Sequence, residues 1–375
     1  MTDILVSGAS VAGTTVAYWL ARHGYSVTVV ERHPGLRPGG QAIDVRGPAL
    51  TVLERMMLRA AADHVRTRIR GASVVDRDGN ELSQDTEAAF SGPSGGPIAN
   101  PDIELLRDDL VELLYDATKL STEYVFDDSI AALEDDGTSV KVTFERSAAR
   151  SFDLVIGADG LHSNVRRLVF GPEAQFIERL GTHAAIFTVP NFLDLDYWQT
   201  WHYGDSTMAG VYSAHDNAEA RAMVGFMEAD LRIDYQDTEA QFAELERRLA
   251  DDGWVRPQLL QYMRTAPDFY FDEMSQIKMD RWSKGRVALV GDAGYCCSPL
   301  SGQGTSVALL GAYILAGELA AAGDDYELGF ANYHKEFHDY VKRNQWLVID
   351  NIPGGAPIPQ EVFDRIVNSI TLKDY

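Results

Sequence analysis

The chain has 375 residues, of which 45% are hydrophobic and 24% are charged, and its formal net charge is -23. This length is sufficient for a large buried core and two subdomains. The negative charge disfavours nucleic acid and anionic membranes as partners, because their phosphate groups would repel the protein. The apolar stretch 307–315 is too short to span a bilayer. We expect a monomer or a dimer that acts in the cytoplasm.

The N-terminal segment has the pattern of a dinucleotide-binding βαβ unit. An apolar strand over 4–8 leads into a tight turn, a helical pattern covers 14–23, and a second strand over 26–30 ends at Glu31. In such a unit the helix N-terminus binds a pyrophosphate and the acidic residue binds ribose hydroxyls. The expected ligand contacts in the turn are Gly8, Ser10, Ala12 and Gly13, with Ser10 in place of the usual middle glycine. Arg32 is either a contact to the adenosine part or a solvated surface residue.

The next segments alternate between turns and short elements. Two glycines followed by a short alternating strand over 37–47 indicate backbone that passes close to a large ligand. We expect an amphipathic helix over 48–64, a hairpin over 72–82 that turns at Asp-Gly, and a loop over 91–97. A further helix is predicted from residue 100 to about 120, with Arg107 in its first turn.

The middle of the chain changes character. Strands are predicted at 124–126 and 140–144, and a buried strand then ends in Asp159. Residues 173–280 are rich in aromatic and β-forming residues and indicate an antiparallel sheet, with a helix over 238–250. Period-2 alternation places Trp198, Thr200 and His202 on one face. We predict that these three, with Tyr212 and Phe226, line a substrate pocket, although aromatic residues serve a core equally well. His202 is a candidate base or simply a packed histidine.

The most informative stretch is 285–305. An apolar strand ends at Gly291-Asp292, a turn rich in Gly, Pro and Ser follows, and an apolar helix covers 305–322. A carboxylate beside a glycine loop and a helix N-terminus can bind a polyol and an electron-rich ring. The simpler interpretation of Asp292 is an N-capping residue in a turn.

Only two cysteines occur, and they are adjacent. Cys296 and Cys297 are too close in sequence for an ordinary disulfide and lack metal-ligand spacing with other residues. We interpret them as loop packing in a reducing compartment, with a contact of one of them to a cofactor left open.

These motifs together resemble the class A, single-component FAD-dependent aromatic hydroxylases, and most closely the tetracycline-inactivating flavin monooxygenases. The resemblance implies an α/β fold with a Rossmann-like FAD-binding domain, an inserted antiparallel β-sheet substrate domain and a C-terminal bridging helix. The expected FAD-binding domain comprises 1–70, 100–172 and 281–324, the substrate domain 71–99 and 173–280, and the C-terminal helix 325–375.

The same resemblance assigns roles to residues outside the βαβ unit. It implies that Asp292 binds the ribityl chain and that the following loop borders the isoalloxazine, while Arg37 contacts the nicotinamide cofactor. An ordinary salt-bridged arginine is the alternative for Arg37 and for Arg46. The further FAD contacts that it implies are Asp44, Arg46, Arg107, Asp159, Pro299, Gly302, Gly304 and Thr305.

The implied activity is hydroxylation of an aromatic or polyketide-like small molecule, for example a tetracycline-like antibiotic. FAD would be bound, NADPH or NADH would reduce it transiently, and O2 would form a C4a-hydroperoxyflavin. No metal and no catalytic side chain is expected, since the flavin carries the chemistry. The alternative is a protein that holds FAD but catalyses a non-redox cyclisation, or merely binds a polyketide. Flavin-dependent halogenation is disfavoured, because a Trp-x-Trp-x-Ile-Pro run is missing.

Overall fold

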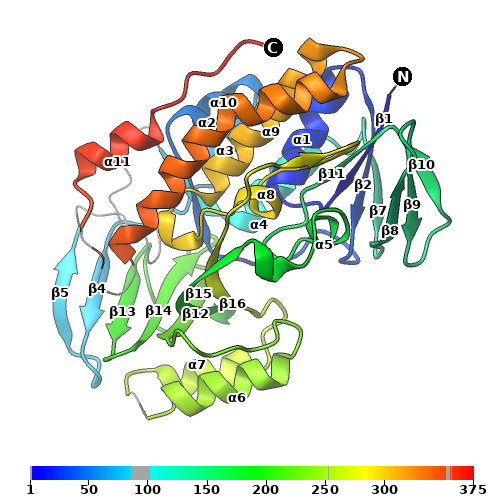
Figure 1. The fold of residues 1–375 in the computed structure, drawn as a ribbon. Helices are drawn as coiled ribbons and strands as arrows, with labels where there is room; N and C mark the ends of the chain where they lie inside the picture. Colours follow the sequence, from blue (N-terminus) through cyan, green and yellow to red (C-terminus); the bar gives the residue numbers. More distant parts are fainter. Residues whose placement is uncertain (1, 87–101, 252, 352–354, 356) are drawn as a thin grey trace.

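The computed structural model describes residues 2–86, 102–251, 253–351, 355 and 357–375. Within these residues, the strands form a six-stranded, a three-stranded and a seven-stranded sheet and a two-stranded pair (Figure 1). The predicted loop at 91–97 lies outside the described residues.

The six-stranded sheet is built on the N-terminal βαβ unit. Strands β1 and β2 pair in parallel, and β1 also pairs in parallel with β11. Ile4, Leu5 and Val6 are fully buried, as expected for a parallel strand that is covered on both faces. The strand order is β17 (Ser283–Lys284), β18 (Val287–Leu289), β11 (Leu154–Gly157), β1 (Asp3–Ser7), β2 (Ser26–Glu31) and β7 (Glu123–Phe126).

Helices pack against this sheet and against one another. The long helix α9 makes its most extensive contacts with α1 and α10. It is long and apolar enough to cross a membrane, but 78% of its most apolar window is buried inside the protein, so core packing accounts for its composition. The helices of this half are α1 (Val11–Arg22), α2 (Pro48–Arg55), α3 (Arg59–His64), α4 (Arg107–Asp116), α5 (Asn164–Val169), α8 (Asp292–Tyr295), α9 (Gly304–Ala322) and α10 (Tyr326–Trp346).

Shorter elements complete this half of the molecule. Strands β8, β9 and β10 form a separate antiparallel sheet beside β7 (Figure 1). Their bounds are Ile130–Asp135, Val140–Phe144 and Arg150–Phe152, and the antiparallel pair is β3 (Ala42–Val45) with β6 (Ile103–Leu106). Single turns of 3-10 helix lie at η2 (Glu173–Gln175), η3 (Pro299–Ser301) and η4 (Leu347–Asn351), and the last helix is α11 (Gln360–Val367).

The seven-stranded sheet combines two distant parts of the chain. Strand β13 pairs antiparallel with β14 and in parallel with β4 of the early hairpin. Helices α6 (Thr238–Leu249) and α7 (Arg256–Met263) cover one face, below the sheet in Figure 1. The strand order is β16 (Tyr270–Ile277), β12 (Ile177–Pro190), β15 (Glu219–Met227), β14 (Thr207–Ala214), β13 (Gln199–Tyr203), β4 (Ala72–Val75) and β5 (Glu81–Asp85).

Two sequence-based boundaries are wrong. The predicted helix over 48–64 is two helices, because Met57 has a φ of 62° and interrupts the helical path. The helix predicted from residue 100 begins only at Arg107, because residues 103–106 form β6 and pair with β3. Arg107 nevertheless stands in the first turn of α4, as predicted.

Candidate FAD and substrate site

The turn after β1 depends on two glycines. Gly8 has a φ of 108°, and a Cβ there would lie 2.5 Å from the carbonyl oxygen of Ala158. A Cβ on Gly13 would collide with the carbonyl oxygen of Gly8. The glycines therefore let β1, the end of β11 and α1 approach closely. Within the described residues the Ser10 side chain does not cap α1, so the N–H groups of its first turn remain available to a pyrophosphate.

Glu31 is held beside this turn. Its carboxylate accepts one hydrogen bond from the backbone N–H of Ala9 at 2.8 Å and another from that of His33 at 2.9 Å. The acid therefore fixes the glycine turn against the end of β2, and its contact with a ribose stays a prediction. Arg32 is exposed to solvent, as its surface alternative requires.

Asp159 accepts hydrogen bonds from within the protein at the start of α5. Its carboxylate accepts hydrogen bonds from the Ser163 hydroxyl and, at 3.0 Å, from the N–H of Val165. Ser163 in turn caps α5 by accepting the N–H of Arg166 at 3.0 Å. Burial raises the pKa of Asp159, against the effect of these hydrogen bonds. The second acidic motif thus fixes the start of α5, and its FAD contact stays a prediction.

Asp292 has a different environment. Gly291, with a φ of 66°, occupies the N-cap position of α8, so Asp292 is not the capping residue that the simpler interpretation expected. Its side chain is exposed to solvent at the end of β18. Desolvation by the protein atoms around the carboxylate raises the pKa of Asp292, and a hydrogen bond with the Cys296 thiol partly offsets this effect. This carboxylate is therefore accessible to a ligand.

The loop that follows leads into the N-terminus of α9. Gly302 has a φ of 65°, and a Cβ on Gly304 would meet nothing within 4 Å among the described residues. The fully buried amide of Gln303 has neither its oxygen nor its nitrogen paired in the part of the chain that the structure describes. Open space beside glycine, an unpaired amide and a helix N-terminus fit a flavin ring at Pro299 to Thr305.

Both cysteines pack inside this loop. The Cys296 thiol donates to the carbonyl of Ser275, and the N–H of Ser298 donates to its sulfur at 3.4 Å. Burial raises the pKa of both thiols, and the Asp292 carboxylate raises them further. The thiols are therefore protonated and inert in the folded protein.

The glycine segment at 37–42 is clamped from both halves of the molecule. The buried guanidinium of Arg107 donates to the carbonyls of Arg37 and Gly39 at 2.7 and 2.5 Å. Burial lowers the pKa of Arg107 to about 10. From the substrate sheet, the Tyr212 hydroxyl accepts the N–H of Ala42 at 3.0 Å. Arg107 therefore shapes this segment, and a direct FAD contact stays a prediction.

Two predicted FAD residues belong to a buried ionic cluster. Asp44 and Arg46 form an ion pair at 3.1 Å, and both are buried. Glu104, which is opposite Asp44 in the β3–β6 pair, is also buried, and burial together with the Asp44 charge raises its pKa. The backbone N–H of Arg46 donates to Ser306 of α9 at 2.9 Å. The cluster therefore lies against the start of α9, and sequence reasoning missed Glu104.

The pocket prediction requires a correction. Trp198 and Phe226 pack into the cluster formed with α6 and α7. Thr200 and His202 pair with Val211 and Ala209, whose side chains belong to this same helix-covered face. These four residues therefore point away from the FAD-binding half. Alternation correctly grouped the residues of β13, but it does not show which face meets the cofactor.

Tyr212 is the predicted pocket residue on the other face. It packs with Trp201 and Met223 against Leu106 and Ala42 of the FAD-binding half. This face was missed because its signal, the complementary alternation Gln199-Trp201-Tyr203, is equally strong in the sequence.

Comparison with known proteins agrees with this architecture. Residues 1–345 match the family model described as FAD binding domain. A flavin-dependent monooxygenase of Legionella longbeachae is 39% identical over 388 aligned residues, covering 99% of this chain and 98% of the relative. An uncharacterized protein of Mycobacterium tuberculosis is 81% identical over the full length of both chains. The crystal structure of tetracycline destructase Tet(51) covers 100% of both chains with a TM-score of 0.90 and 34% identity. The chain therefore belongs to the FAD-binding monooxygenase family.

Proposed function

We propose that this enzyme uses NADPH or NADH and O2 to hydroxylate an aromatic or polyketide-like small molecule, and that tetracycline-like antibiotics are candidate substrates. The observation that carries the proposal is the likeness to tetracycline destructase Tet(51), which extends over the substrate sheet as well as the FAD-binding half. The relatives named as flavin-dependent monooxygenases support the same chemistry.

When bound, FAD would accept a hydride and activate O2. The chain's own contribution is to hold and shield the cofactor. The N-terminus of α1 would bind the pyrophosphate, Asp292 would accept hydrogen bonds from ribityl hydroxyls, and the backbone before α9 would stabilise negative charge on the ring. Arg37, which is exposed, would bind a phosphate of the nicotinamide nucleotide.

The substrate would approach from the sheet face that carries Trp201 and Tyr212. This face also bears Met208 and Met223, and Tyr203 extends it with an exposed ring. Aromatic and thioether side chains suit a large, planar, largely apolar ligand. The proposed pocket is therefore lined by this face of the sheet, and it no longer includes Trp198, Thr200, His202 and Phe226.

The decisive test is turnover of a panel of tetracyclines, aromatic polyketides and simple phenols by the FAD-loaded enzyme. A true substrate should increase NADPH consumption, and labelled O2 should place one labelled oxygen atom in the product. A cyclase would convert its substrate without NADPH or O2 and leave its mass unchanged. Equal conversion under anaerobic conditions would show that the hydroxylase proposal is wrong.

A further inference from the structure

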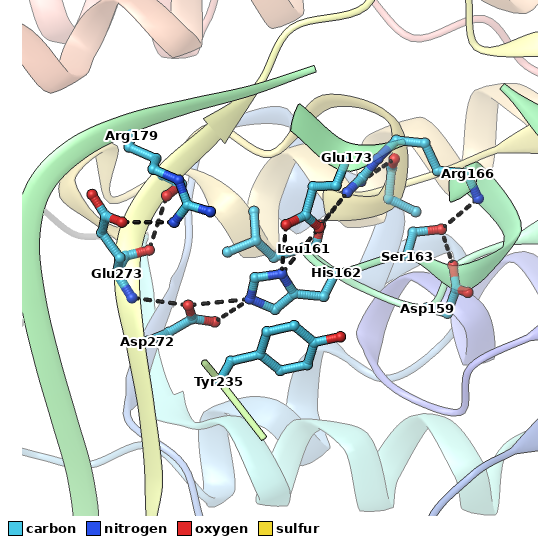
Figure 2. A network of polar contacts seen from close by, with 12 residues as sticks. Asp159, Leu161, His162, Ser163, Arg166, Glu173, Arg179, Tyr235, Asp272 and Glu273 are labelled. Atoms are coloured by element: carbon cyan, nitrogen blue, oxygen red, sulfur yellow. Dashed lines mark hydrogen bonds and ion pairs between the residues drawn. The ribbon is translucent and has the colours of Figure 1, made fainter. Parts of the chain in front are cut away.

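His162 lies between two carboxylates, three residues after Asp159 (Figure 2). Its Nδ1 is 3.0 Å from Glu173 and its Nε2 is 3.1 Å from Asp272. The ring stacks on Tyr235 with a centroid distance of 3.9 Å and an interplanar angle of 2°. An imidazole donates from both nitrogens only when it is protonated, so this arrangement selects the cation.

The cation joins elements from both halves of the molecule. His162 precedes α5, and Glu173 lies in η2 and also accepts a hydrogen bond from the buried Arg166 at 3.0 Å. Asp272, by contrast, lies on β16 of the substrate sheet, and Tyr235 lies between β15 and α6. One charged ring therefore links the FAD-binding half to Asp272 of β16, in addition to the hydrogen bonds that Ser275, Gln276 and Ile277 of β16 make with residues 296–297.

The groups around His162 favour its charge. Glu173 and Asp272 face the ring nitrogens, and Arg166 pairs with Glu173 on the side away from the ring (Figure 2). Arg179 pairs with Glu273, the neighbour of Asp272, at 2.7 Å (Figure 2). Burial lowers the pKa of His162, but the hydrogen bonds to the two carboxylates outweigh it and raise the pKa to about 9.

The network continues from Asp272 to the proposed nicotinamide contact. The Tyr270 hydroxyl donates to Asp272 at 2.7 Å, and the guanidinium of Arg37 lies 5.0 Å from the centre of the Tyr270 ring. Asp272 therefore connects the charged His162 to the aromatic platform under Arg37. A neutral imidazole has only one N–H donor, so neutralising His162 would break its hydrogen bond to either Glu173 or Asp272 and weaken the link between them.

We propose that His162 is a positioning residue, which as a cation clasps β16 to the FAD-binding half and thereby holds Tyr270 and Arg37 in place for a nicotinamide nucleotide. The role of Tyr270 and Arg37 toward a nicotinamide nucleotide rests on the proposed function. The link that His162 makes between β16 and the FAD-binding half concerns the protein alone.

The binding test uses FAD-loaded enzyme titrated with NADP+, which binds without turnover. In the wild type, affinity should fall about tenfold between roughly pH 7 and pH 10, the effect of one lost charge-assisted hydrogen bond. His162→Gln should bind weakly throughout and lack this transition. His162→Arg, a planar cation that does not titrate, should restore affinity and keep it flat with pH. His64→Gln, at an exposed position on α3, should match the wild type. A wild-type pH profile in His162→Gln would overturn the positioning role.

A second measurement tests the clasp without a nicotinamide. The ring of His162, followed by NMR in the FAD-loaded wild type, should titrate near pH 9, and Asp272→Asn should bring its pKa down towards the ordinary value. A pKa near 6.5 in the wild type would overturn the clasp. If NADP+ binds to neither the wild type nor His162→Arg while the wild-type ring titrates near pH 9, the nicotinamide proposal fails, and the link between His162 and β16 stands.

Discussion

Asp292 and Asp159 end neighbouring parallel strands, yet the structure predicts opposite effects for their removal. The Asp292 side chain is exposed and does not cap α8, so Asp292→Ala should change the free energy of unfolding of the apoprotein by no more than about 0.5 kcal/mol. If its carboxylate binds the ribityl hydroxyls, FAD binding should weaken by about 1.5–3 kcal/mol. That corresponds to roughly a 10- to 150-fold larger dissociation constant.

Asp159→Ala is the matched control. It removes the acceptor of the Ser163 hydroxyl and of the Val165 N–H, so it should cost about 1–2 kcal/mol of apoprotein stability, as lost helix caps do. Urea unfolding of both apoproteins and fluorescence titration with FAD measure the two quantities separately. An unchanged FAD dissociation constant in Asp292→Ala would refute the ribityl assignment. A large loss of its apoprotein stability would show instead that the residue is structural.

Three further predictions follow from particular contacts. Gly13→Ala should lower stability by about 1–3 kcal/mol and weaken FAD binding, because the new Cβ collides with the Gly8 carbonyl. The control Gly24→Ala strains a backbone with a φ of 86° but has open space around it in the described structure, so it should lower stability and leave FAD affinity unchanged. Gly304→Ala should leave apoprotein stability equal or higher yet weaken FAD binding at least about tenfold; unchanged affinity would mean that the flavin does not occupy this space. Because the pKa of His162 is raised from 6.5 to about 9, its contribution of about 3 kcal/mol should be complete below pH 6.5 and lost as the pH rises through 9. Urea unfolding of wild type and His162→Gln across this range measures that loss, and parallel curves would contradict it.

Local patterns predicted the FAD-binding half well, because its motifs are contiguous. The strand, glycine turn and helix of 4–22 are coded within one short segment, and the acidic residue at 31 follows at a fixed spacing. The loop and helix at 299–322 were likewise predicted, since Gly, Pro and Ser separate a buried strand from an apolar helix. Such signals do not depend on distant partners.

The failures arose where distant segments decide the outcome. Residues 103–106 became a strand because β3, far away in the sequence, provides its hydrogen-bonding partner. The orientation of β13 was decided by α6 and α7, which occur later in the chain and cover the face of Trp198. The environment of His162 needed three separate elements to converge, and a histidine after Asp-Gly-Leu gives no sign of that.

The alkylation rate of the two buried cysteines can report how often the flavin loop opens. Cys296 and Cys297 react with a thiol reagent only when the loop around them opens, because their buried thiols are protonated in the closed state. Their alkylation rate in the native protein therefore reports the free energy of local opening rather than of global unfolding. FAD that binds the closed loop should slow the reaction in proportion to its saturation. The same pair of sulfurs can thus measure cofactor binding kinetically, without any substrate.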